Sequence, residues 1–143
     1  MVKAHNTKLE LLRKGHARVA LLVNPNVAEL SSQQNAFSSQ GIQCVVARDL
    51  PTALLAITQH VIDLAVVSSR VFEEGDGWAL SGVLRMVFPN AYIVVLTPET
   101  SVMTLQAAIN NGLNQVYESG TPAEELVETI LQQQPEWGSG RAN

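Results

Sequence analysis

Short apolar runs alternate along the chain with longer stretches whose apolar residues recur at helical spacing. The runs are three to six residues long and mostly continuous, which favours β-strands that are buried on both faces. The strands predicted in this way are 19–23, 42–47, 64–67, 92–96 and 115–117.

The stretches between the strands predict five helices, each with one apolar side. The residues expected to point inward are Val27, Leu30 and Phe37; Leu54, Ile57 and Val61; Leu80, Val83, Leu84 and Val87; Val102, Leu105 and Ile109; and Leu126, Val127, Ile130 and Leu131. Cap and proline signals fit helix starts at Asn24-Pro25, Asp49, Thr97-Pro98 and Thr121-Pro122-Ala123-Glu124, and helix ends at Gly41 and Asn111-Gly112.

Strict alternation of strand and helix predicts an α/β fold, a doubly wound (βα)5 domain in which helices cover both faces of a five-stranded parallel sheet. We expect this domain to span residues 17–133, after an N-terminal arm of residues 1–16 and before a flexible C-terminal tail of residues 134–143. Sites in such folds lie at the carboxyl ends of the strands. The loops to inspect are therefore 24–26, 68–77, 97–100 and 118–121.

Composition narrows the possible functions. The 143 residues suit one domain, and 46% apolar against 15% charged residues indicates a folded chain. No apolar run is long enough to span a membrane and the N-terminus lacks a secretory signal, so we expect a cytoplasmic protein. Cys44 is the single cysteine, and it forms no familiar zinc pattern with His5, His16 and His60; neither metal nor cofactor is predicted.

The net charge of −4 is unevenly distributed. The first eighteen residues carry +4 and the remainder −8. Such a basic arm supports at most weak, salt-sensitive contact with nucleic acid or an acidic membrane surface. A solvated segment that precedes the folded domain explains the excess of basic residues as well. No helix-turn-helix pattern is present, so direct nucleic-acid binding is not predicted.

The order and spacing of several motifs resemble the receiver domain of bacterial response regulators over about residues 17–133. The stretch IDLAVVSSRVFEEGDGWAL, with Asp63 and Asp76-Gly77, is similar to the family's phosphoacceptor strand and the turn that follows it. IVVLTPE, which ends its strand at Thr97, and NNGLNQVYESGTPAEEL resemble the family's fourth strand and its lysine-containing fifth. The resemblance implies a flavodoxin-like fold with strand order 2-1-3-4-5.

The resemblance also implies a phosphorylation pocket, and this chain lacks its reactive groups. The acidic pair of the family falls at Asn24-Pro25, or at Asn26 if the loop is shifted. The phosphoacceptor falls at Ser68 or Ser69, and the lysine falls at Ser119. The first aspartate is at position 49 and the last lysine at position 14, so no realignment restores the set. Thr97 alone matches, and it also fits a helix cap.

The family's second switch residue, an aromatic on the fifth strand, aligns with Val116, while strand alternation points Tyr117 to the opposite face. These losses predict a pseudo-receiver that signals through protein–protein interaction without aspartyl phosphorylation. The residues that we expect on its interaction face are Thr104, Gln106, Glu118 and Glu125. This face could also be merely solvated, or it could form a homodimer.

An alternative is a small-ligand or anion site built from the hydroxyl and amide side chains of the degenerate pocket, although no glycine-rich phosphate loop is present. An enzyme is not predicted. His60 lies at the end of a helix away from this edge and Cys44 lies within an apolar strand, so no nucleophile has a base in reach.

Overall fold

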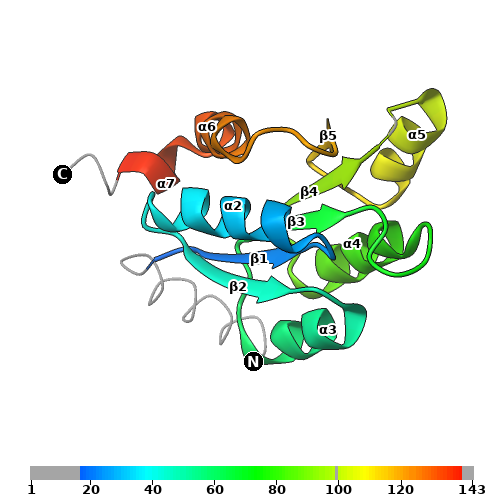
Figure 1. The fold of residues 1–143 in the computed structure, drawn as a ribbon, viewed down its shortest axis with the longest axis horizontal. Helices are drawn as coiled ribbons and strands as arrows, with labels where there is room; N and C mark the ends of the chain where they lie inside the picture. The colour runs from blue at the N-terminus through cyan, green and yellow to red at the C-terminus, as the bar shows by residue number, and fades with distance from the viewer. Residues whose placement is uncertain (1–16, 99, 140–143) are drawn as a thin grey trace.

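The computed structural model describes residues 17–98 and 100–139 (Figure 1). The basic arm expected at residues 1–16 lies outside these residues. In chain order the elements are β1 (Val19–Val23), α2 (Val27–Ser38), β2 (Gln43–Ala47), α3 (Leu50–Gln59), β3 (Leu64–Ser68), α4 (Asp76–Val87), β4 (Tyr92–Thr97), α5 (Val102–Asn110), β5 (Gln115–Glu118), α6 (Ala123–Gln133) and α7 (Pro135–Ser139). Each predicted strand is confirmed to within a residue at either end.

The five strands form one parallel sheet in the order β2-β1-β3-β4-β5, which confirms the predicted fold class and strand order. Figure 1 shows α2 and α6 on one face of the sheet and α3 and α4 on the other. The helices between successive strands make every connection a crossover, as parallel pairing requires. Among the described residues no helix is long and apolar enough to cross a membrane.

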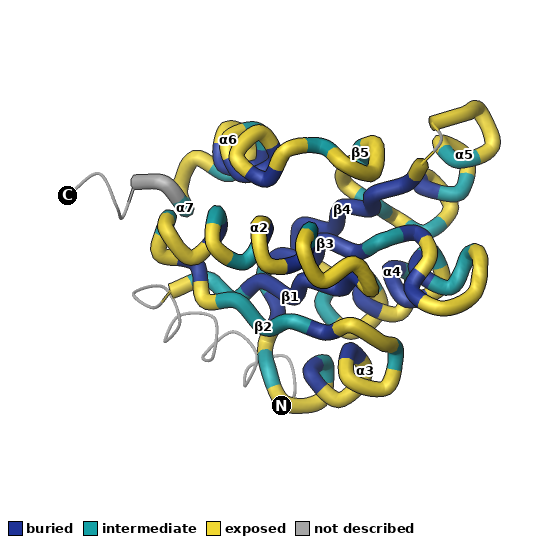
Figure 2. The backbone as a smooth tube through the Cα atoms, viewed as in Figure 1, coloured by how far each residue is buried: buried dark blue, intermediate teal, exposed yellow. Residues whose placement is uncertain are grey.

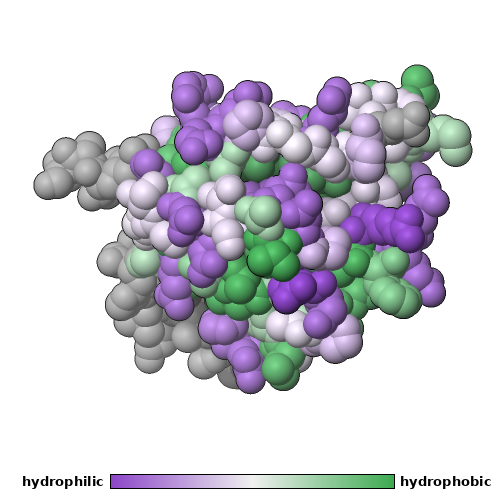
Figure 3. Space-filling model, in the orientation of Figure 1, coloured by the Kyte–Doolittle hydropathy of each residue, from purple (hydrophilic) through white to green (hydrophobic). Residues whose placement is uncertain are grey.

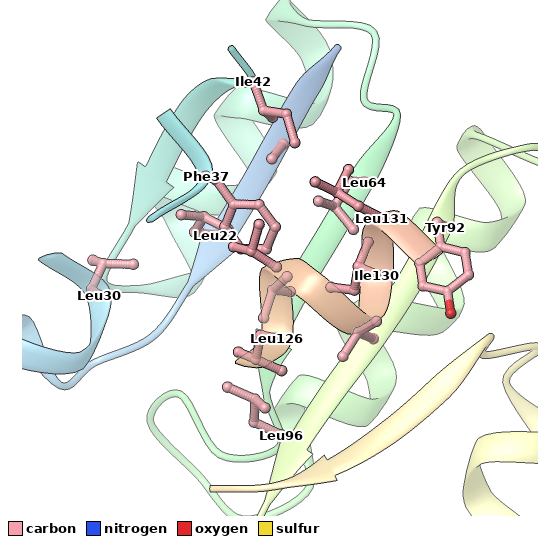
Figure 4. Packing of buried hydrophobic residues seen from close by; sticks show 14 residues of the cluster. Leu22, Leu30, Phe37, Ile42, Leu64, Tyr92, Leu96, Leu126, Ile130 and Leu131 are labelled. Atoms are coloured by element: carbon pink, nitrogen blue, oxygen red, sulfur yellow. The ribbon is translucent and has the colours of Figure 1, made fainter. Parts of the chain in front are cut away.

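Each face of the sheet has its own hydrophobic core, because successive strand residues point to opposite sides. Leu22, Leu64 and Val94 face α2 and α6 and pack with Phe37 and Ile130, in the cluster drawn in Figure 4. Leu21, Val67 and Val95 face α3 and α4 in a second cluster. The central strands are accordingly the most deeply buried part of the backbone in Figure 2.

Three of the predicted inward helix faces are wrong in part. In α2, Leu30 and Phe37 are buried as predicted, but Val27 is 51% exposed. In α3 the buried residues are Ala53 and Ala56, whereas Leu54 and Val61, just beyond its end, are each 47% exposed. In α4, Leu80 and Leu84 are buried as predicted, but Val83 and Val87 are exposed. Small side chains let α3 approach the sheet closely, and the larger ones are left outside.

The α5 helix departs furthest from the prediction. Only Ala108 is buried, and all three residues expected to point inward, Val102, Leu105 and Ile109, are exposed. Figure 2 shows this helix at one end of the molecule, largely in the colour of exposed residues. The apolar side of α5 is thus turned to solvent.

Several predicted helix starts shift by two to four residues. The N-cap of α2 is Asn26 rather than Asn24, and the N-cap of α5 is Ser101, which forms a capping box with Thr104. Thr97 is the last residue of β4, so its predicted cap role is wrong. The predicted capping box at Thr121 is also wrong, because α6 begins at Ala123 with Pro122 as an N-cap that makes no side-chain hydrogen bond.

Within the segment expected to be the C-terminal tail, the structure places the short helix α7. Trp137 is half-buried and packs against the cluster on the α2 and α6 face. The Arg18 guanidinium lies 5.8 Å from the centroid of the Trp137 ring, a cation–π contact that joins α7 to the start of β1.

Candidate functional site

The strand register brings the predicted pocket residues to one edge of the sheet. Val23 pairs with Val67, Ser68 with Leu96, and Thr97 with Glu118. Asn24, Ser68, Thr97 and Ser119 therefore lie at the carboxyl ends of neighbouring strands, where α/β folds bind their ligands.

The loop after β1 is held by its two asparagines. Asn24 is only 2% exposed; its Oδ1 accepts the Asn26 backbone N–H at 2.9 Å and its Nδ2 donates to Glu29 at 2.5 Å. Asn26 Oδ1 accepts the Glu29 backbone N–H at 3.0 Å and so caps α2, while Pro25 is exposed. These amides are engaged in shaping the loop, and neither brings negative charge to a cation.

Glu29 is the site residue that the sequence analysis missed. One of its carboxylate oxygens accepts from Asn24 Nδ2, and the other accepts the Gly120 backbone N–H at 3.0 Å. The second bond joins the loop after β1 to the loop after β5, across 91 positions of sequence. An acidic residue three positions after the N-cap Asn26 is a recognised capping signal and could have drawn attention to Glu29, although not to Gly120.

The two candidate acceptor serines lie at the end of β3, and the Ser68 hydroxyl is engaged in a local hydrogen bond. Ser68 ends β3, is half-buried, and its Oγ donates to the Arg70 carbonyl at 2.9 Å. Ser69 is 6% exposed, and its backbone N–H donates to the Leu96 carbonyl at 2.8 Å. The carbonyl oxygen of Ser68 also faces Gly77, where an added Cβ would lie 1.8 Å from it. Only glycine lets α4 start this close to β3.

Asp76 organises the loop between β3 and α4. Its carboxylate accepts the backbone N–H groups of Val71 at 2.7 Å, Glu73 at 2.8 Å and Phe72 at 2.9 Å. Burial raises the pKa of Asp76, but these backbone donors outweigh burial and hold the pKa below its ordinary value. This aspartate is therefore a structural acceptor of hydrogen bonds.

At the far side of the edge lie Thr97 and Ser119. Thr97 is 4% exposed, and its carbonyl accepts the Ser119 N–H at 2.8 Å, while Ser119 itself is exposed. Val116 and Tyr117 are both half-buried, and Tyr117 packs against the cluster beside α6. Burial is the main cause that raises the pKa of Tyr117, and the nearby Tyr92 and Glu125 raise this pKa further. The Tyr117 hydroxyl has no hydrogen-bond partner among the described residues.

The predicted interaction residues divide into two groups. Gln106, Glu118 and Glu125 are exposed. Thr104 is half-buried, and its Oγ1 accepts the Ser101 N–H at 2.7 Å within the capping box of α5, so its hydroxyl is engaged in the helix start.

The chemistry open to this edge is that of neutral polar groups. Within residues 17–98 and 100–139, no three metal-ligating side chains come close enough to hold an ion. The chain has no lysine after position 14. What the strand ends offer is hydroxyls, amides and backbone N–H groups; the carboxylates of Glu29 and Asp76 beside them are already hydrogen-bonded, and Glu118 at the end of β5 is exposed.

The fold is that of CheY-like response regulator receiver domains. The chain is similar to a receiver domain protein of Methanospirillum hungatei, with a TM-score of 0.76 and 18% identity over 87% of this chain and 98% of that one. It is similar to a response regulator of Thermotoga maritima, with a TM-score of 0.72 and 18% identity over 81% of this chain and 96% of that one. At these identities the similarity shows the fold.

A relative in sequence is the photosynthetic apparatus regulatory protein RegA of Rhodobacter capsulatus, 27% identical over 122 residues. The match covers 85% of this chain and spans 66% of the length of RegA. No protein-family model matches the chain.

Proposed function

We propose that the chain is an atypical response-regulator receiver domain that acts in signal transduction by binding a protein partner, independently of aspartyl phosphorylation. Its fold and its similarity to RegA support the signalling role. The same proposal includes a cytoplasmic location and no catalytic reaction of its own.

The chemistry of the edge supports independence from phosphorylation. Phosphoryl transfer to a receiver needs a carboxylate nucleophile, a divalent cation and a positive group on the transferring phosphoryl. The corresponding positions hold Ser68 or Ser69, Asn24 with Pro25, and Ser119. None of these side chains is charged.

The observation that carries partner binding is the outward apolar side of α5. Val102 is 80% exposed, Met103 82% and Ile109 77%. In Figure 3 a few hydrophobic side chains lie at the outer end of this helix, among paler ones. Contiguous exposed apolar side chains mark interaction sites on soluble domains. Gln106, Glu118 and Glu125 would form the polar rim of an interface over α5, β5 and α6, and a homodimer through this interface is the form that we propose.

Independence from phosphorylation is tested by incubating the chain with acetyl phosphate and Mg²⁺ and measuring its mass by mass spectrometry. Thermal unfolding with and without Mg²⁺ and beryllofluoride is measured in parallel, because a ligand of the native state raises the melting temperature. We expect no added phosphoryl group and no shift. An adduct or a clear shift would show that the pocket works with unfamiliar residues.

The interface part is tested by light scattering at high protein concentration. A variant with Met103→Glu and Ile109→Glu places charges on the exposed apolar residues of α5, and Gln59→Glu, at an exposed position of α3 away from this interface, is the matched control. We expect a dimer for the original chain and the control, and for the double variant a monomer that keeps the circular dichroism spectrum of the folded chain. A monomeric original chain would contradict the homodimer.

The alternative anion site receives less support from the structure. The Glu29 carboxylate lies against Asn24 Nδ2 and the Gly120 N–H, so it already engages two of the donors that an anion would need. It would also repel a second negative charge placed beside it.

A further inference from the structure

A second pocket lies on the α2 and α6 face of the sheet, away from α5. It has a volume of about 400 Å³ and is lined by the first turns of the two helices and the loop before α6, including Glu29, Gln33, Gly120 and Glu124. The pocket is a groove that is open to solvent. The pocket shares the start of α6 with the rim of the interface proposed above, but it does not include the apolar residues of α5 that carry that interface.

Gln33 is the unusual residue of this pocket. It is 1% exposed, and neither Nε2 nor Oε1 of its amide has a hydrogen-bond partner among the described residues. Leaving a buried polar atom unpaired costs about 1–3 kcal/mol, so leucine at this position would be more favourable for folding alone. An amide that faces this cost and lines a pocket points to a ligand that pairs with it.

The start of α6 adds backbone donors to the same pocket. Its N-cap Pro122 makes no side-chain hydrogen bond, and the neighbouring Thr121 Oγ1 donates instead to the Glu118 carbonyl at 2.6 Å. The first N–H groups of a helix have no partner within the helix. Ala123 and Glu124 therefore present donors beside Gln33, whose side chain comes from the facing helix.

The charges of the pocket determine which ligand fits. Two carboxylates, Glu29 and Glu124, line it, and the described lining residues include no lysine, arginine or histidine. An anion is disfavoured by the carboxylates. A neutral group with a donor and an acceptor side by side matches the Gln33 amide, which offers one of each.

We propose that this pocket binds a small uncharged molecule with a carboxamide-like edge, and that Gln33 recognises that edge. The amide atoms of Gln33 are shielded from solvent in the structure, so binding includes a rotation of this side chain toward the pocket. The oxygen of the ligand accepts from the start of α6 or from Gln33 Nε2, and its N–H donates to Gln33 Oε1.

Three probes of one size test the proposal: benzamide is neutral, benzoate is an anion, and benzamidine is a cation without an acceptor. Each is titrated into isotope-labelled protein while amide resonances are followed by NMR. We expect benzamide to shift Gly120, Ala123 and the Gln33 side-chain amide at millimolar concentration, and benzoate to bind more weakly. Benzamidine, which the two carboxylates attract, should leave the Gln33 side-chain amide unshifted, and a shift as large as that caused by benzamide would contradict recognition by Gln33. Absence of benzamide binding, or equal binding of benzoate, would overturn the proposal.

Variants locate the binding. Gln33→Leu should raise the melting temperature, because it removes the unpaired amide, and should weaken benzamide binding by about tenfold or more, which corresponds to one good hydrogen bond. Gln34→Leu, at the adjacent position and outside the pocket lining, is the matched control. Ala28→Leu, at an exposed lining position, should narrow the pocket and also weaken binding, which keeps the test decisive if Gln33→Leu folds poorly. Unchanged binding in Gln33→Leu or in Ala28→Leu would refute the site.

Discussion

The Glu29 contact offers the sharpest test of how the edge of the sheet is held. In Glu29→Gln the side chain keeps its shape but replaces one oxygen with an NH2 group. Both present partners of Glu29, Asn24 Nδ2 and the Gly120 N–H, are donors. The new amide can accept from one of them and must face the other with its own donor.

The expected loss of folding stability in Glu29→Gln follows from the loss of one hydrogen bond to a charged group. Such bonds contribute about 1.5–3 kcal/mol when well formed, and Glu29 is half-exposed, so we expect a loss of about 1–2 kcal/mol. For a domain of this size that corresponds to a melting temperature lower by about 3–6 °C. Part of the loss comes from the charge of Glu29 near the start of α2, which stabilises the helix through its dipole by about 0.3–1 kcal/mol.

The two contributions are separated by hydrogen exchange at the Gly120 amide. Loss of the link between loops should speed exchange of that amide, whereas loss of the dipole term alone leaves it unchanged. Glu128→Gln, at an exposed position on α6, is the control for removing one negative charge. An unchanged melting temperature together with unchanged exchange at Gly120 would refute the link.

Three further predictions concern the loops of the same edge. Ser68→Asp should gain no phosphoryl group from acetyl phosphate in a mass spectrum, because a restored carboxylate still lacks the acidic pair and the lysine; an adduct would contradict this. Gly77→Ala should lower the free energy of unfolding by about 3 kcal/mol or more, since its Cβ would lie 1.8 Å from the Ser68 carbonyl oxygen. Gly41→Ala, at φ 81° in open space, is the control and should lower the free energy of unfolding by about 1 kcal/mol. Equal losses for the two variants in denaturant titrations would contradict the close approach of α4 to β3. Because the pKa of Asp76 is lowered in the folded state, its stabilisation is fully present above the unfolded value of about 3.9 and is lost as pH falls through the folded value. The stability difference between the original chain and Asp76→Asn should therefore be constant above about pH 5 and shrink below about pH 4, and a difference that grows in acid would refute the assignment.

Much of the fold follows from local pattern. Runs such as 19–23 and 92–96 are continuously apolar because both faces of a central strand are covered, and this signal needs no knowledge of neighbours. Helix faces were harder to predict. The pattern placed Leu54 inward by its hydrophobicity, whereas the sheet selects Ala53 and Ala56 for their small volume.

The candidate site, too, could be predicted only in part. The residues at the strand ends could be placed from order and spacing, because parallel strands end at one edge. The roles of Asn24, Asp76 and Thr104 as partners of nearby backbone could not be placed so readily, because several local caps compete in each loop and differ by only a few residues.

The sequence by itself determined which chemistry is missing, since a chain with no aspartate before position 49 and no lysine after position 14 cannot place an aspartate after its first strand or a lysine after its fifth. Tertiary structure alone decided that Glu29 meets Gly120 and that the apolar side of α5 faces solvent. Both features depend on where the sheet places segments that are distant in sequence. For α5 the sequence pattern could not decide, because an amphipathic helix has the same pattern whether its apolar side packs on the chain's own sheet or is open to a partner.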